Sequence, residues 1–137
     1  MQFLFTLVLS VVLSGTLPIK KESKQITATV INATTDEGKV MFALYTKDNF
    51  LRIPIQSATA TIKEGKSTVV FNNIPKGEYA VVCYHDKNNN EKMDFSPRGM
   101  PIEDYGASNN IMTLGPPQFY NAKFLVADKD VSLEIKF

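Results

Sequence analysis

The stretch Val131-Ser132-Leu133-Glu134-Ile135-Lys136-Phe137 alternates between apolar and polar residues at every step. This period of two is typical of a β-strand that buries one face in a core and exposes the other to water. A similar apolar stripe occupies alternate positions of residues 122–126. The polar residues 127–130 between the two stripes predict a hairpin turn. We therefore predict that this part of the chain forms two paired strands.

Five further segments upstream have the composition of strands, because β-branched and aromatic residues dominate them and turn residues separate most of them. They are residues 26–31, 40–45, 58–62, 68–71 and 78–85. No segment has a convincing helical stripe. Seven short strands predict an all-β fold, an antiparallel sandwich of about seven strands.

Segment 78–85 is apolar on both faces, which predicts a central strand that is covered on both sides. The residues that follow, 86–118, carry prolines and glycines that disfavour a long regular element. They also carry more large apolar side chains than is usual for a disordered segment, in which these side chains would be exposed to water. We expect a long ordered loop that packs on the sandwich between the last two hairpin regions.

The chain has 137 residues, the length of about one domain. Residues 1–17 contain an apolar run that is too short to span a bilayer and that ends in small residues, the pattern of a secretory signal peptide. We expect an exported protein (periplasmic, outer-surface or extracellular) with a flexible segment at 18–25, a sandwich at 26–137 and no membrane span after signal removal. The net charge of +1 argues against nucleic acid as a partner. Cys83, the only cysteine, is predicted to be a buried small hydrophobe.

The sharpest local signal is Asp86-Lys87-Asn88-Asn89-Asn90-Glu91-Lys92-Met93-Asp94. Side-chain oxygens at its positions 1, 3, 5 and 9, with the main-chain oxygen at position 7, form a pattern that calcium accepts. Two residues depart from that pattern: Glu91 replaces the usual glycine, and Pro97 replaces the usual closing glutamate, so Glu103 or Asp104 would have to close the site. The hypothesis is a modest calcium site, our only cofactor prediction, against the alternative of an Asx turn that bonds its own main chain. The predicted ligands are Asp86, Asn88, Asn90, Lys92, Asp94 and Glu103.

Three functional hypotheses stay open. The first is a non-enzymatic binding or structural module, with a protein or glycan partner at a surface formed by the long loop. The second is a small hydrolase of transthyretin-like fold that uses His85, the only histidine, as a general base. The third is a carbohydrate-binding module that uses the loop aromatics Phe95, Tyr105, Phe119 and Tyr120. We expect no enzyme and no catalytic residue, and the predicted ligand surface consists of His85, Tyr105, Ser108, Asn109, Asn110 and Phe119.

Two phrases of the sequence resemble known families. The run Phe71-Asn72-Asn73-Ile74-Pro75-Lys76-Gly77-Glu78-Tyr79 resembles a strand-turn-strand phrase of prealbumin-like and immunoglobulin-like sandwiches. A second set of phrases resembles the bacterial family called domain of unknown function 2141. The set consists of Tyr84-His85-Asp86, the Asx residues that follow, Gly99-Met100-Pro101-Ile102-Glu103 and Gly115-Pro116-Pro117-Gln118-Phe119. The resemblance covers about residues 25–137. It implies an exported bacterial sandwich and no established activity.

Overall fold

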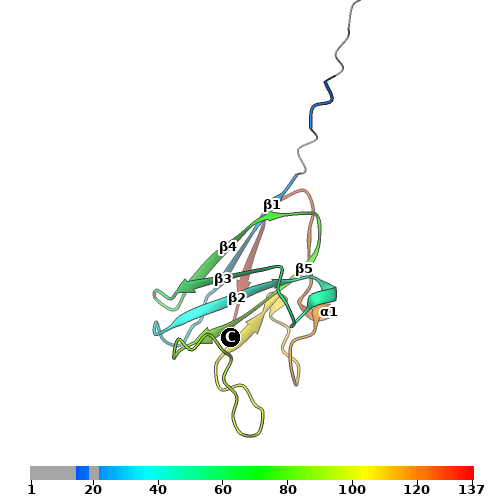
Figure 1. Cartoon of the computed structure of the whole chain (residues 1–137). Helices are drawn as coiled ribbons and strands as arrows, with labels where there is room; N and C mark the ends of the chain where they lie inside the picture. The colour runs from blue at the N-terminus through cyan, green and yellow to red at the C-terminus, as the bar shows by residue number, and fades with distance from the viewer. Residues whose placement is uncertain (1–14, 19–21) are drawn as a thin grey trace, which may run out of the picture.

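The computed structural model describes residues 15–18 and 22–137. The predicted signal peptide, residues 1–17, lies outside the described residues except for its last three positions. Eight strands form two sheets that face each other (Figure 1). Their bounds are β1 (Lys24–Val30), β2 (Lys39–Tyr45), β3 (Gln56–Thr61), β4 (Ser67–Ile74), β5 (Gly77–Asp86), β6 (Tyr105–Ala107), β7 (Phe124–Val126) and β8 (Val131–Ile135).

The first sheet has the order β4-β1-β8, and the second has the order β3-β2-β5-β6, with β7 also paired to β5. The predicted all-β fold is confirmed, and each of the seven predicted strands overlaps an observed one. The eighth strand, β6, arises from the long loop and pairs antiparallel with β5. The smaller sheet is mixed, because β1 pairs antiparallel with β4 but parallel with β8.

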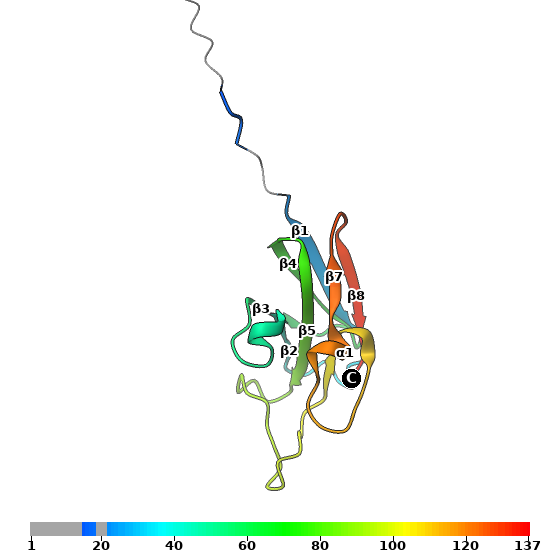
Figure 2. The same ribbon diagram turned by 90° about the vertical axis from the view of Figure 1, so that its right-hand side faces the viewer.

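The predicted hairpin at residues 127–130 is wrong. Figure 2 shows β7 and β8 next to each other, but β7 pairs with β5 whereas β8 pairs with β1, so the turn connects the two sheets. Side chains of the turn hold it at both sheets. Asp128 forms an ion pair of 2.9 Å with Lys76 just before β5, and Asp130 accepts a hydrogen bond of 2.8 Å from the Gln25 amide of β1.

The core lies between the sheets and receives alternate residues of the strands, with Ala58 and Ala60 of β3 partly buried against it. In β5, Tyr79, Val81 and Cys83 share one face and are buried in this core. Cys83 is fully buried, as predicted, and burial raises the pKa of its thiol far above the ordinary value. Large core side chains include Phe42 and Leu44 of β2, Ile26 of β1, Phe71 and Ile74 of β4, and Ile135 of β8.

The opposite face of β5 is also covered near Ala80, which agrees with the predicted two-sided burial. A second cluster joins Ala80 to Ala107 and Ala122, and Phe50 and Phe119 pack against it. Phe50 and Phe119 meet edge to face with ring centroids 5.6 Å apart. The covering residues come from the turn after the short helix η1 (Lys47–Asn49) and from the one-turn helix α1 (Phe119–Ala122). Sequence periodicity does not reveal a helix of four residues.

Ser108 joins β5 to α1 beneath this cluster. Its fully buried hydroxyl accepts a hydrogen bond of 3.1 Å from the Val81 amide and donates one to the Ala122 carbonyl. Ser108→Ala leaves the buried Val81 amide without its acceptor, so we expect the free energy of unfolding to fall by about 1–3 kcal/mol. Urea denaturation measures this loss. The exposed Ser132→Ala serves as the control and is expected to stay within about 0.5 kcal/mol of the parent, and an equal loss in both variants would contradict the assignment.

Candidate functional site

The Asp/Asn-rich segment leaves the end of β5 and begins the loop that projects from one end of the sandwich (Figure 1). Asp86, the last residue of β5, is fully buried. Its two carboxylate oxygens accept hydrogen bonds from the amides of Asn90 (3.2 Å) and Glu91 (2.9 Å). These bonds fold the chain into a tight turn, in which Glu91 has a φ of 61°. Glu91 therefore adopts the left-handed conformation at the position where such loops normally have glycine.

Asn88 and Asn90 converge on Asp94. Their amide nitrogens donate to the two oxygens of Asp94 over 2.8 Å and 2.7 Å. These two hydrogen bonds lower the pKa of Asp94, with the Asn90 bond the larger cause. The side-chain oxygen of Asn90 accepts from the amide of Lys92 over 3.0 Å. This arrangement contains the hydrogen bonds of the Asx-turn alternative, and calcium binding stays a prediction.

Glu103 folds back onto the loop. It is only 6% exposed, and its Oε2 accepts a hydrogen bond of 3.4 Å from the Asp94 amide. No donor from the described part of the chain reaches its Oε1. Burial raises the pKa of Glu103, and the nearby charges of Asp94 and Asp86 raise it further. Within residues 15–18 and 22–137, no three His, Cys, Asp or Glu side chains form a cluster able to hold a metal by themselves.

His85 does not belong to the predicted ligand surface, because it is fully buried. It follows Tyr79, Val81 and Cys83 on the core-facing side of β5, and its ring stacks on Phe137 at 6.2 Å. Its Nε2 lies 2.6 Å from the Glu37 carbonyl, which can only accept, so Nε2 carries the hydrogen. The hydrolase hypothesis thus loses the access to substrate that its general base requires. The strand alternation of β5 was the signal that could have revealed this burial.

Of the three predicted surface residues at 108–110, Ser108 needs correction. Ser108 is buried, and it bonds the main chain as described above. Asn109 and Asn110 are exposed, but their amides hold neighbouring segments: Asn109 donates to the Asn121 and Lys123 carbonyls, and Asn110 bonds the main chain of β8 and the residue after it. Both asparagines have positive φ angles, which asparagine tolerates better than most residues. The two side chains thus hold neighbouring segments in place, and their contact with a ligand stays a prediction.

The loop aromatics divide between two places. Phe95 and Tyr105 line a groove, whereas Phe119 is half-buried against Phe50. The ammonium group of Lys123 lies over the ring of Tyr120, with its Nζ atom 5.2 Å from the ring centroid. Of the four side chains predicted as a sugar-stacking platform, the groove brings together Phe95 and Tyr105. Tyr105 is the predicted ligand-surface residue that lines the groove.

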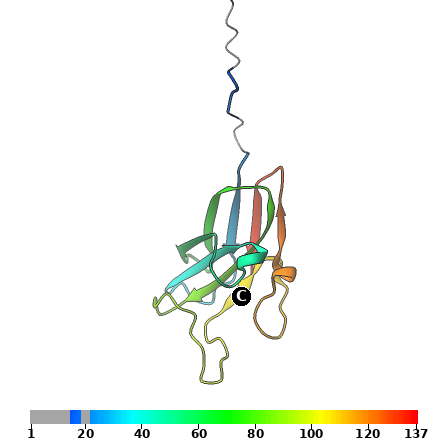
Figure 3. The ribbon, with the colours of Figure 1, turned by 45° about the vertical axis from the view of Figure 1, so that its right-hand side comes forward.

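Sequence reasoning missed the groove itself. It has a volume of about 630 Å³ and runs over the outer face of β5, where Val82 and Tyr84 form its floor. Two loops, residues 93–101 and 115–117, supply its walls, and Figure 3 shows both extending from the same end of the sandwich. Phe95 and Met100 in the first wall are 58% and 65% exposed. The outward alternation of Val82 and Tyr84 indicated an apolar outer face, but the walls come from distant segments.

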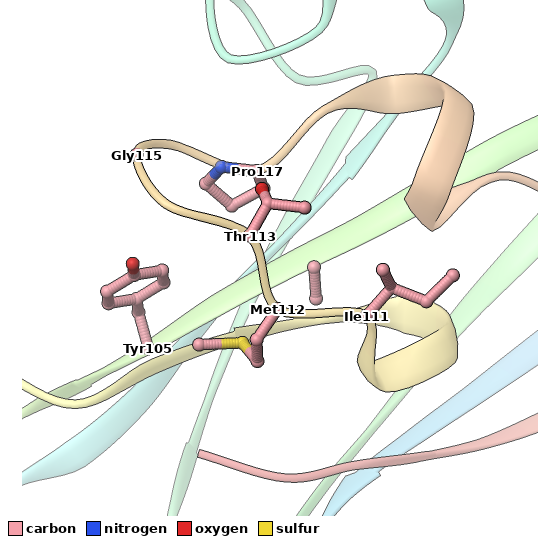
Figure 4. Close-up of a pocket in the computed structure, with 7 residues that line it drawn as sticks. Tyr105, Ile111, Met112, Thr113, Gly115 and Pro117 are labelled. Atoms are coloured by element: carbon pink, nitrogen blue, oxygen red, sulfur yellow. The ribbon is translucent and has the colours of Figure 1, made fainter.

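A smaller hollow of about 10 Å³ lies beside the groove, between Tyr105 and the loop around Met112 (Figure 4). In the close-up, Ile111 points away from Tyr105. The loop that runs from Met112 through Thr113 and Gly115 to Pro117 borders the hollow. Space of this size holds about one water molecule. Of these two hollows, the groove is therefore the one with room for a ligand. Within residues 15–18 and 22–137, no helix is both long enough and apolar enough to cross a membrane.

The fold and the site define a class: a two-sheet β-sandwich with an Asp/Asn-rich loop and an apolar groove at one end. A family model described as "Uncharacterized protein conserved in bacteria (DUF2141)" matches residues 28–134, from β1 to β8. The chain belongs to this bacterial family, domain of unknown function 2141, which confirms the resemblance noted in the sequence. No curated protein and no solved structure matches the chain.

Proposed function

We propose that this protein is an exported, non-enzymatic binding module that takes an apolar small molecule in the groove over β5. The observation that carries the proposal is the groove: its volume of about 630 Å³ is in the usual range for small-molecule sites. Export is supported by the signal-peptide pattern of residues 1–17.

The lining of the groove favours an apolar ligand. Val82 supplies part of the floor, and Phe95 and Met100 in the wall are more than half exposed. Covering exposed apolar area releases about 25 cal/mol for each Å² removed from water. A ligand that covers these three side chains would gain most of its binding free energy in this way.

Tyrosine hydroxyls provide the polar contacts that orient a ligand. Tyr45, Tyr84 and Tyr105 all line the groove. Burial raises the pKa of Tyr84, and the charge of Asp86 raises it further, so this hydroxyl stays protonated at neutral pH. A protonated phenol both donates and accepts hydrogen bonds. The ligand expected here is mostly apolar with one or two polar atoms.

Binding of the uncharged solvatochromic dye Nile red to the full chain tests the proposal. We expect saturable binding with a blue-shifted emission. The double substitution Phe95→Ser and Met100→Ser removes two exposed side chains from the wall, so we expect the affinity to fall at least tenfold while the fold persists.

Leu125→Ser is the matched control, because Leu125 is 66% exposed and does not line the groove. It is expected to bind the dye as the parent does. The proposal is rejected if the parent shows no saturable binding, or if both variants lose affinity equally.

A further inference from the structure

We propose that Glu103 closes a calcium site formed with Asp86, Asn88, Asn90 and Asp94. This site goes beyond the groove and does not depend on a ligand there. What points to a cation is the state of Glu103: it is more than nine-tenths buried, and its Oε1 meets no donor from the described residues. A buried carboxylate oxygen that lacks a partner is costly, and cations or hydrogen bonds normally compensate it.

The charges around Glu103 strengthen the case for a cation. Asp86 is fully buried, the Asp94 amide donates to Glu103, and the negative charges of Asp94 and Asp86 both act on Glu103. Two nearby lysines are engaged with other carboxylates, and the positive charge of Lys92 acts on Asp94 rather than on Glu103. Lys87 pairs with Asp104 at 3.3 Å, and Lys39 pairs with Glu91 at 3.1 Å. A divalent ion would neutralise the charge that the protein leaves uncompensated.

The turn already has the main-chain course that a calcium loop needs. Asp86 gathers the amides of Asn90 and Glu91, and Glu91 has the positive φ that the sharp turn requires. Asn88 and Asn90 bring their amide groups within 2.8 Å of Asp94. The two ends of an amide have nearly the same shape, so a half-turn of each group would present an oxygen in place of a nitrogen.

The ligand chemistry selects calcium and sets a modest affinity. The candidate ligands are all oxygens, which suits a hard cation, and they lie on a turn that can adjust to six or more contacts. Magnesium requires a stricter octahedral geometry. Because no cluster of three acidic, His or Cys side chains alone can hold a metal in the described chain, amide and main-chain oxygens must complete the shell. The expected dissociation constant is therefore in the range of roughly 0.1–1 mM.

Thermal unfolding of the full chain tests the site. At about ten times the dissociation constant, calcium is expected to raise the midpoint by about 5 °C relative to chelator, and magnesium much less. Glu103→Gln keeps the shape of the side chain and removes its charge. We expect this variant to melt in chelator at the parent temperature or above it, and to lose the calcium shift.

Asp104→Asn is the matched control, since Asp104 is the adjacent carboxylate and pairs with Lys87. It should keep the full calcium shift. Calorimetric titration of the unmodified chain provides a readout that no substitution affects, with one calcium site expected. The proposal fails if calcium gives neither heat nor shift up to about 10 mM, if magnesium acts equally, or if Glu103→Gln keeps the parent's shift.

Discussion

Gly38→Ala is expected to destabilise the sandwich by about 2–5 kcal/mol. Gly38 precedes β2 with a φ of 70°, a conformation that costs an alanine about 1–2 kcal/mol. In addition, a Cβ atom here would press against the main-chain oxygen of Asp86 and lie 2.8 Å from the Cα of Lys87. These atoms belong to the main chain and cannot rotate away from the new Cβ atom as a side chain could. The end of β5 would therefore have to shift. Overpacking of this kind costs about 1–3 kcal/mol more.

Gly99→Ala separates the two contributions to this loss. Gly99 has a φ of 77°, close to that of Gly38, but a Cβ atom there would meet nothing within 4 Å. We therefore expect Gly99→Ala to lose only the conformational part, about 1–2 kcal/mol. Denaturant unfolding of both variants gives the comparison. If the two glycines proved equally costly to replace, close approach at Asp86 would not be the reason for Gly38.

Phe42→Ala is expected to have the largest effect of any single substitution considered, a loss of about 3–5 kcal/mol. Phe42 is 2% exposed and lies in β2 between Ala58 of β3 and Cys83 of β5. Truncation loses the transfer free energy of the ring and leaves a cavity between the sheets. Domains of this kind have a total stability of about 5–15 kcal/mol, so the variant would retain little of it.

The midpoint and slope of urea unfolding measure this loss. Phe42→Leu refills most of the space and should recover the greater part of the stability. Leu125→Ala is the surface control, because that side chain is 66% exposed, and its expected change is within about 0.5 kcal/mol. A loss below about 1 kcal/mol in Phe42→Ala would show that the two sheets do not depend on this ring.

The strands were predictable because alternation of apolar and polar residues reports burial on one side of a sheet. The order of the strands within each sheet was not predictable, because the burial of a strand does not identify the strand that pairs with it. Residues 127–130 have the composition of a hairpin turn, yet they cross between sheets. The strand β6 was missed because it has three residues and a glycine at its centre. Gly106 allows close approach, since a Cβ atom there would lie 2.5 Å from the Lys136 carbonyl.

The site was predictable only where it is local in sequence. The spacing from Asp86 to Asp94 indicated a tight turn, and the need for a closing carboxylate pointed to Glu103 or Asp104, of which Glu103 folds back. The groove was not predictable, because Val82, Met100 and Pro117 approach each other only in the folded chain. The hydrogen bonds of Asn109 and Asn110 were not predictable for the same reason: the carbonyls that they bind lie in other segments.

The parallel pairing of β1 with β8 has a consequence for how the chain acquires its fold. Ile26 pairs with Val131, and Asn32 exchanges hydrogen bonds with Phe137, residues 105 positions apart. Closing so long a stretch makes the contact order high, and such topologies fold slowly. The central strand of the smaller sheet gains its second neighbour only after β8 has been synthesised. A chain with this topology therefore remains incompletely paired until its last strand is available, a property that would suit the export proposed above.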